Sequence, residues 1–465
     1  MYTQAQSGKL SAGSYVQGSD RFAKIDQRKA LSLTAAIEQG LRANYDQNQR
    51  DLSLEVLDLN WEDTKEAFWL PQLQLNLTSG PQRVGRIKAG QLGNQGYSRR
   101  PTGTIGIGLG DYTLFNWGKD YLAYLNSKET YRRSNTVFKE QKRALKHSII
   151  IKYFELAYFN RLIEIYRRQL RHASFVYRFN REKVSIRKVS KQEYYQSRSE
   201  YLRAQNSFQD ATRNLKVAEE QLAFLITDAP STRYILKDQL DFQRIQLPLE
   251  DAVGIAKENN PQIRESNKDV KNAKRSYQIQ LRENLPLPKF SVNLGAYNHT
   301  FAPGVNTTRY NSGLSGNQID VVATINATWS LTGVGGFLNQ RTTRRAHVNR
   351  TRTFSELTEA RHQTQSDIQR AYYKIKTFEQ QIRILEAASV TNTKTFDVVL
   401  ENYLNRKTPY INFQDSLLEA VASDIGLAEL YYAHTREKVL LAQEMGVDEF
   451  PGKSFEGLAK PAEVK

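Results

Sequence analysis

The feature that most constrains the fold is a long run of the sequence that contains no helix breaker. From Lys119 to Arg187 the chain has neither proline nor glycine, the two residues that interrupt helices most strongly. At the usual rise per residue, a single helix over this range would be about 100 Å long. Helices of that length are rare in globular domains and are typical of coiled coils and helical tunnels. The run therefore predicts a fold that is mainly α, with very long helices.

A further helix is predicted after a short turn, and its apolar residues follow a seven-residue repeat. The repeat consists of Tyr194, Ser197, Tyr201, Ala204, Phe208, Ala211, Leu215, Ala218, Leu222 and Leu225. A similar repeat near the C-terminus consists of Leu418, Val421, Ile425, Ala428, Tyr432, Thr435, Val439 and Ala442. Such spacing is typical of helices that supercoil around one another. We expect these residues to be packing positions without a chemical role.

The sequence also indicates an internal duplication. Four segments recur in the same order: LSLTAAIEQGLRANY as LPLEDAVGIAKENNP, LPQLQLNL as LPKFSVNL, YTLFNWG as WSLTGVG, and IRKVSKQEYY as NRKTPYINFQ. The offset between the copies drifts only from 216 (247 − 31) to 219 (406 − 187). Because a repeat determines how the whole fold is interpreted, each half is predicted as helix, strand, loop, strand, long helix, turn and long helix.

The repeat divides the chain into four predicted segments. They are a polar N-terminal segment over 1–30, a first repeat over 31–246, a second repeat over 247–447 and a polar tail over 448–465. Within the repeats, the tips of the two helix hairpins are expected at about 186–191 and 405–410.

Four strands are predicted, at about 72–80, 102–115, 289–301 and 319–331. Apolar residues alternate with amide, hydroxyl or glycine residues along each strand, as they do in strands with one buried face. The pattern fits either a soluble sandwich or outer-membrane strands, and the polar faces favour a lumen over bulk water. Four strands cannot close a barrel, so membrane strands would have to be shared between chains, and three chains would supply twelve.

The composition excludes some kinds of site but is compatible with more than one class of protein. There are 66 Lys and Arg against 49 Asp and Glu, a formal charge of +17, and no cysteine, which excludes disulfides and thiolate sites. The run from Arg161 to Lys191 holds ten basic residues, so a soluble basic coiled-coil scaffold or a nucleic-acid-binding protein is an alternative to a membrane protein. The six histidines form no ligand-spaced or triad-like cluster. We expect no enzyme activity, no catalytic or metal site and no cofactor.

These motifs together resemble the TolC-like outer-membrane efflux channels over Leu31 to Val447. The residues that carry the resemblance are LPLEDAVGIAKENNP and its twin, LPQLQLNL, YTLFNWG, the duplication, and the turns that lead into SKQEYYQSR and PYINFQDSLLEA. The resemblance implies a homotrimer with a twelve-stranded β-barrel in the outer membrane and a helical tunnel across the periplasm. It also implies an exit duct for small toxic molecules or proteins in tripartite efflux or type I secretion, with a periplasmic adaptor and an inner-membrane transporter as partners, and no nucleic acid.

The resemblance also implies three groups of functional residues. Those of the periplasmic entrance are Arg187, Glu193, Tyr403, Arg406, Asn412 and Asp415. Those of the tips that dock an adaptor are Lys188, Val189, Ser190, Lys407, Thr408 and Pro409. Those that face lipid are Leu73, Leu75, Leu77, Ile105, Ile107, Leu109, Phe290, Val292, Leu294, Ala323, Ile325 and Trp329.

The predicted tips depart from the family pattern, which usually has glycine where this chain has Arg187 and Arg406. Because arginine lacks the easy access of glycine to positive φ, we expect these turns to use other backbone conformations, helped by Pro409. If the arginines face the pore, the entrance should favour anions. The alternative is that they face outward and pair with an adaptor or with Glu193.

Overall fold

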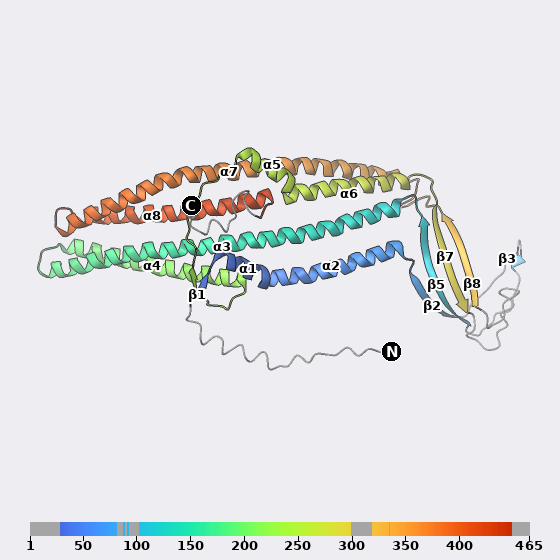
Figure 1. Cartoon of the computed structure of the whole chain (residues 1–465), viewed down its shortest axis with the longest axis horizontal. Helices are drawn as coiled ribbons and strands as arrows, with labels where there is room; N and C mark the ends of the chain where they lie inside the picture. Colours follow the sequence, from blue (N-terminus) through green and yellow to red (C-terminus); the bar gives the residue numbers. More distant parts are fainter. Residues whose placement is uncertain are drawn as a thin grey trace, which may run out of the picture. The chain divides into compact units, whose positions relative to one another are not determined.

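The computed structural model describes residues 28–80, 87–88, 91–92, 102–298, 319–333 and 335–448. Almost all of the predicted N-terminal segment and tail lie outside these residues. The elements in chain order are β1 (Lys29–Leu31), α1 (Leu33–Ala43), α2 (Tyr45–Trp69), β2 (Leu73–Gly80), β3 (Ile87–Lys88), β4 (Gln91–Leu92), β5 (Thr102–Phe115), α3 (Lys119–Ser185), α4 (Lys191–Ile226), β6 (Tyr234–Leu236), α5 (Leu249–Asn259), α6 (Pro261–Glu283), β7 (Lys289–Asn298), β8 (Ile319–Thr328), α7 (Gln340–Leu404) and α8 (Tyr410–Met445), labelled in Figure 1 where space allows. The fold is mainly helical, as predicted.

The chain forms two compact units, and each draws on both halves of the sequence. The first unit comprises 1–52, 136–264 and 359–465, and the second comprises 53–135 and 265–358. The compact units are therefore not the two sequential repeats, because each repeat contributes helix hairpins to the first unit and strands to the second.

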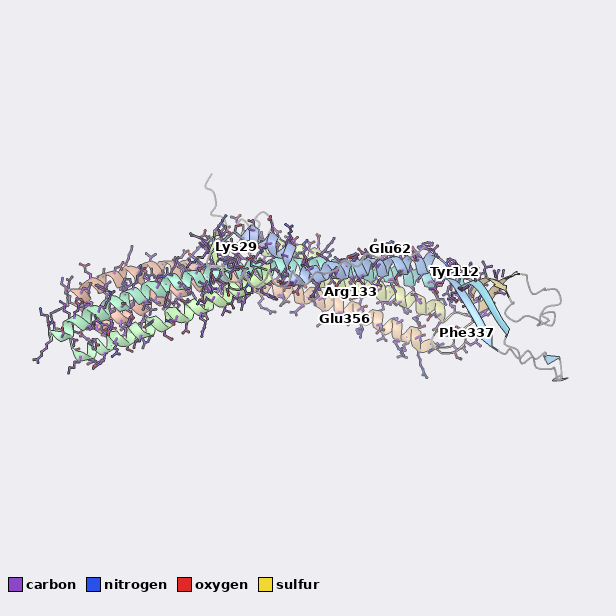
Figure 2. The ribbon with its side chains drawn as sticks, turned by 90° about the horizontal axis from the view of Figure 1, so that it is seen from below. Lys29, Glu62, Tyr112, Arg133, Phe337 and Glu356 are labelled. Carbon is purple, nitrogen blue, oxygen red and sulfur yellow. The ribbon has the colours of Figure 1, made fainter. Side chains whose placement is uncertain are left out.

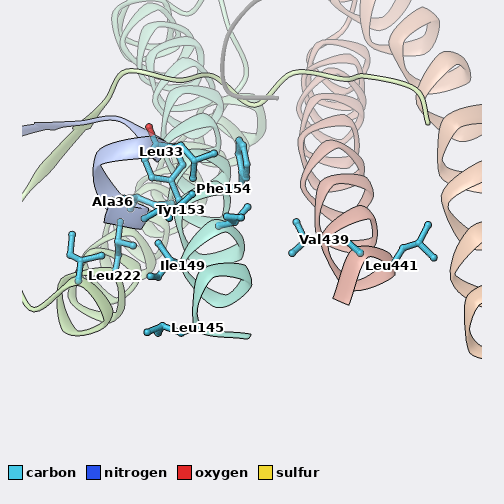
Figure 3. Packing of buried hydrophobic residues seen from close by; sticks show 14 of the residues in the cluster. Leu33, Ala36, Leu145, Ile149, Tyr153, Phe154, Leu222, Val439 and Leu441 are labelled. Atoms are coloured by element: carbon cyan, nitrogen blue, oxygen red, sulfur yellow. The ribbon is translucent and has the colours of Figure 1, made fainter. Parts of the chain in front are cut away.

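The core of the first unit packs α1 against α3 and α4. Ser32 caps α1 by accepting a hydrogen bond from the Ala35 backbone N–H, and the apolar face that follows is buried. Figure 3 shows Leu33 and Ala36 of α1 beside Ile149 and Tyr153 of α3 and Leu222 of α4. The Tyr153 hydroxyl donates to the Asp238 carboxylate (2.8 Å). The hydrogen bond ties the segment after β6 to this core.

The two predicted seven-residue repeats are confirmed as packing positions. Every one of their residues is buried or half-buried, from Tyr194 to Leu225 in α4 and from Leu418 to Ala442 in α8. The most enclosed positions include small residues such as Ala204 and Ala428, which let helix backbones approach closely.

Two asparagines tie the short helices of the first unit to the ends of α4 and α8. Asn44 donates from Nδ2 to the carbonyl of Leu225 (2.8 Å), and Asn260 donates to the carbonyl of Glu444 (2.7 Å). Helix C-termini leave carbonyls without intrahelical partners, so each asparagine satisfies one of them. The sequence match between LSLTAAIEQGLRANY and LPLEDAVGIAKENNP pairs these same two asparagines.

The helical part of the second unit is held by aromatic stacking and by charge. Trp61 of α2 stacks on Tyr124 and Tyr131 of α3, with ring centroids 5.5 and 5.2 Å apart. Arg133 of α3, labelled in Figure 2, donates to Asp269 of α6 (2.7 Å) and also pairs with Glu265. These contacts join α2, α3 and α6 next to the sheet-forming segments of the same unit.

The second unit contains an antiparallel sheet of four strands in the order β2-β5-β7-β8. Cross-strand partners such as Leu75↔Ile107, Leu109↔Leu294 and Leu294↔Ala323 share one face of the sheet. The pairing of β5 with β7 shifts between Leu109 and Tyr112 and again between Thr113 and Phe115, and β5 has one extra residue at each shift. The short strands β3 and β4 pair with each other.

The predicted end of the fourth strand differs from the structure, and the predicted end of the third cannot be compared with it. β8 ends at Thr328, so Trp329 follows the strand instead of lying within it. β7 ends at Asn298, and residues 299–301 of the predicted strand lie outside the described part of the chain. In the described residues, no helix is both long and apolar enough to cross a membrane.

Candidate functional site at the hairpin tips

The first tip closes the hairpin of α3 and α4 with a compact helix-ending turn. The backbone N–H of Arg187 donates to the carbonyl of Val184 (3.1 Å), and the backbone N–H of Lys188 donates to the carbonyl of Lys183 (2.9 Å). This pair of bonds defines a Schellman motif, in which the residue after the helix adopts a left-handed conformation. Ser190 then begins α4 by accepting a hydrogen bond from the Glu193 backbone N–H.

The second tip closes the hairpin of α7 and α8 with the same bonds. The backbone N–H of Arg406 donates to the backbone carbonyl of Tyr403 (3.0 Å), and the backbone N–H of Lys407 donates to the backbone carbonyl of Asn402 (2.8 Å). Pro409 occupies the N-cap position of α8, with no side-chain capping bond. Each tip therefore presents an arginine followed by a lysine at equivalent positions of one motif.

The expectation that the two arginines avoid positive φ is wrong. Arg187 has φ 55° and Arg406 has φ 60°, so both adopt the left-handed conformation that glycine favours. The two helix-ending hydrogen bonds of each turn require that conformation and outweigh the steric cost of the arginine Cβ, which is about 1–2 kcal/mol per residue. The turn geometry is thus retained although the glycine is not.

A hollow of about 310 Å³ lies between the two tips. Its lining residues are Phe179, Lys188, Val189, Glu193, Tyr403, Arg406, Lys407, Thr408 and Pro409. Three of them are cations and one is an acid, so the hollow is electropositive. It brings together three of the six residues predicted for the entrance and five of the six predicted for adaptor docking, from both hairpins.

Tyr403 joins the two hairpins beneath this hollow. Its hydroxyl donates to Oδ1 of Asn180 on α3 (2.8 Å), and both side chains are buried. Burial raises the pKa of Tyr403 to about 12; the Asn180 hydrogen bond opposes the rise and the nearby Glu193 carboxylate adds to it. The hydroxyl therefore remains a donor at physiological pH.

The remaining predicted entrance and tip residues lie outside the hollow. Arg187 and Ser190 are exposed on the first tip, and Asn412 and Asp415 are exposed on the first turns of α8. Among the described residues, no ion pair joins Glu193 to either tip arginine, so that part of the alternative reading has no support in the structure.

Sequence reasoning missed two buried polar contacts near the tips. Asn180 occupies a core position of α3, in line with Ala173 and Val176, and a polar residue at such a position was a usable signal. Glu200 of α4 is also buried. It accepts hydrogen bonds from Gln169 of α3 and Gln414 of α8, both at 3.4 Å, and so ties both hairpins together. The partners of a buried glutamate cannot be read from sequence spacing.

The sheet of the second unit carries the residues predicted to face lipid. Leu73, Leu75 and Ile325 are 71%, 72% and 75% exposed, and Ile107, Leu294, Ala323 and Trp329 are exposed as well. Leu109, Phe290 and Val292 are half-buried. The side chains of Leu77 and Ile105 lie outside the described part of the structure. An exposed and contiguous apolar face is a candidate contact surface.

Comparisons with known proteins agree with this arrangement. The family model described as outer membrane efflux protein matches residues 63–227. The chain has the fold of outer-membrane efflux proteins. Similar solved structures include a membrane protein from Pseudomonas aeruginosa, with a TM-score of 0.74 and 15% identity over 90% of this chain and 92% of that chain. The outer membrane protein VceC from Vibrio cholerae has a TM-score of 0.72 and 12% identity over 89% of this chain and 96% of that chain. The CmeC outer membrane channel from Campylobacter jejuni has a TM-score of 0.72 and 16% identity over 89% of this chain and 85% of that chain. No curated protein matches the sequence significantly.

The comparisons confirm the resemblance drawn from the sequence motifs. The matched family is one of channels, and the comparisons give no support to the alternative of a soluble scaffold or nucleic-acid-binding protein. Among the described residues, no group of three or more His, Asp or Glu side chains is placed to hold a metal ion.

Proposed function

We propose that this chain is one protomer of an outer-membrane channel that exports small toxic molecules or proteins. Three copies would each contribute four strands to one barrel, and their helix hairpins would form the tunnel through the periplasm. The proposal includes the internal duplication, because both predicted copies contain the same asparagine contact and the same helix-ending turn.

The sheet is the observation that carries this function. One face presents exposed leucine and isoleucine, whereas the opposite face carries glycine and polar residues, of which Gly108 and Ser291 are buried and Gln74 and Asn326 are exposed. β2 and β8 are the edges of the sheet, and backbone groups at an open edge cannot remain unpaired in lipid. Pairing β2 of one copy with β8 of the next satisfies both edges and closes a barrel.

Two neighbouring substitutions on β2 test which face contacts lipid. Leu75→Arg places a charge on the apolar face, which costs about 2–4 kcal/mol near the bilayer midplane. Gln74→Arg places the same charge on the opposite face, which would line the lumen. We expect Leu75→Arg to reduce the amount of trimer in the outer-membrane fraction, and Gln74→Arg to assemble normally. Equal assembly of the two variants would contradict the barrel.

We further propose that the hairpin tips form the periplasmic entrance of this channel. The buried Tyr403–Asn180 hydrogen bond would hold the hairpins together in a closed state. Arg187 and Arg406 would add two positive charges per copy, beside Glu193, Asn412 and Asp415. If these charges line the pore, the entrance should select anions.

The same tips are proposed to dock a periplasmic adaptor, which would connect the duct to an inner-membrane transporter. The exposed lysines of the two turns, Lys188 and Lys407, are available for such contacts, as are Val189, Thr408 and Pro409 at the hollow. Reversing the charge of both lysines should weaken adaptor binding in a pull-down assay. Unaltered binding would assign docking to another surface.

A further inference from the structure

A line of arginines runs along α3 towards the first hairpin tip. Arg167, Arg171, Arg178 and Arg181 are exposed, and their separations of four, seven and three residues place them on one face of the helix. We call these four residues the arginine stripe. From its first to its last residue the stripe extends about 21 Å.

The charge of the stripe is not neutralised within the described part of the chain. None of the four arginines forms an ion pair there, and Arg178 donates only to the carbonyl of Ser174 on its own helix (3.4 Å). The neighbouring Arg168 is different, because it pairs with Asp424 of α8. Like charges spaced four residues apart slightly destabilise a helix, so the stripe does not stabilise α3.

An exposed aromatic residue lies within the stripe. Phe175 is 45% exposed and follows Arg171 by one helical turn, three residues before Arg178. The exposed acids on this stretch of α3 are Glu164 and Glu182, one at each end of the stripe. An aromatic side chain bordered by arginines is the composition that dominates protein–protein interfaces.

We propose that the arginine stripe with Phe175 docks an acidic amphipathic helix of a partner protein. Carboxylates at three- and four-residue spacing on that helix would match the four arginines, and an apolar residue between them would cover Phe175. The proposal rests on the proposed channel function, because it specifies the chemistry of the protein that binds beside the tips. The exposed Lys188 and Lys407 would extend the same positive surface to the end of the hairpins.

A pair of synthetic peptides tests the stripe directly. Each is a helix of about 20 residues, long enough to cover the stripe. One carries glutamates at the matching spacing around a central leucine, and the other has the same composition in scrambled order. Binding to the full chain, extracted in detergent as it assembles, is measured by fluorescence anisotropy. We expect the matched peptide to bind more tightly, with an affinity that falls as salt rises.

Charge-reversal variants locate the binding. Arg171→Glu with Arg178→Glu should weaken binding of the matched peptide on the order of tenfold or more. The matched control is Lys142→Glu with Lys216→Glu, the same change of charge at exposed lysines of α3 and α4 away from the stripe, and it should leave binding unchanged. Equal binding of both peptides, or equal losses in both variants, overturns the proposal.

The remaining outcomes separate this proposal from the channel function. Ion conductance in planar bilayers is measured on the same protein without peptide, so absence of conductance counts against the channel and not against the stripe. A shift of reversal potential in the stripe variant with peptide binding unchanged would place the stripe on the ion path. Loss of the trimer in that variant would make it a contact between copies of this chain. Either result would overturn docking of a partner helix.

Discussion

Arg187 and Arg406 both have a left-handed backbone conformation. Substitutions at these two positions can therefore separate the effect of their charge from the effect of their backbone strain. Arg187→Gly with Arg406→Gly removes both the charge and the strained Cβ from each turn. Arg187→Ala with Arg406→Ala removes the same charge but keeps a Cβ at φ 55° and 60°. The two double variants therefore carry the same charge and differ only in backbone terms, namely the strained Cβ and the larger unfolded-state entropy of glycine.

The expected magnitude follows from the backbone conformation. A residue with a Cβ in the left-handed conformation destabilises the folded state by about 1–2 kcal/mol. Glycine avoids this cost, but its larger entropy in the unfolded chain offsets roughly 0.5–1 kcal/mol of the gain. The glycine variant should therefore gain about 0.5–1 kcal/mol per turn, and the alanine variant should stay close to the parent. For a unit of this size, each kcal/mol corresponds to roughly 2–4 °C in thermal midpoint.

Two measurements on the same variants complete the test. Thermal unfolding followed by circular dichroism should rank the glycine variant above the alanine variant. Reversal potentials in a salt gradient should shift towards cations by the same amount in both, because both remove two charges per copy. A glycine variant no more stable than the alanine variant would refute the strain argument. Unchanged reversal potentials in both would refute an entrance lined by these arginines.

Three other substitutions test separate contacts. Tyr403→Phe leaves the buried amide of Asn180 without its hydrogen-bond donor, so we expect a loss of about 1–3 kcal/mol and a higher conductance if this bond closes the entrance. Burial lowers the pKa of His434 from 6.5 to about 4. Between pH 7 and pH 5 the unfolded chain therefore takes up a proton that the folded chain does not, and His434→Phe should remove about 2 kcal/mol of acid destabilisation. Gly446→Ala would place a Cβ 2.2 Å from the carbonyl oxygen of Asn259 at φ +70°, and should cost on the order of 3 kcal/mol.

Each of these expectations has a result that contradicts it. For Tyr403→Phe, the contradiction is an unchanged thermal midpoint together with unchanged conductance. For His434→Phe, it is a drop in midpoint from pH 7 to pH 5 as large as in the parent; the exposed His362→Gln serves as the control. For Gly446→Ala, a midpoint within 1–2 °C of the parent, which is within the range of ordinary surface substitutions, would show that the close approach of α5 and α8 is not required.

Local patterns predicted the helices and the two faces of each strand, because these features depend on neighbouring residues. The absence of breakers before Arg187 predicted α3, and three-to-four spacing predicted which faces of α4 and α8 are buried. Strict alternation in QLQLNL placed Leu73 and Leu75 on one face, and the observed register of β2 and β5 agrees.

Contacts between distant segments could not be predicted in this way. The hydrogen bond from Tyr403 to Asn180 joins residues 223 positions apart, and nothing in either hairpin specifies the pairing. The error at Arg187 and Arg406 has a different origin. Residue preference alone disfavours a positive φ for arginine, but the two hydrogen bonds of the helix-ending turn decide the conformation.

The central claim is that three copies of this chain form one outer-membrane channel. Single-particle electron microscopy of the detergent-extracted protein tests it most directly. We predict particles with threefold symmetry, in which one barrel continues into one helical tunnel. A uniform population of monomers that stays in solution without detergent would contradict the account.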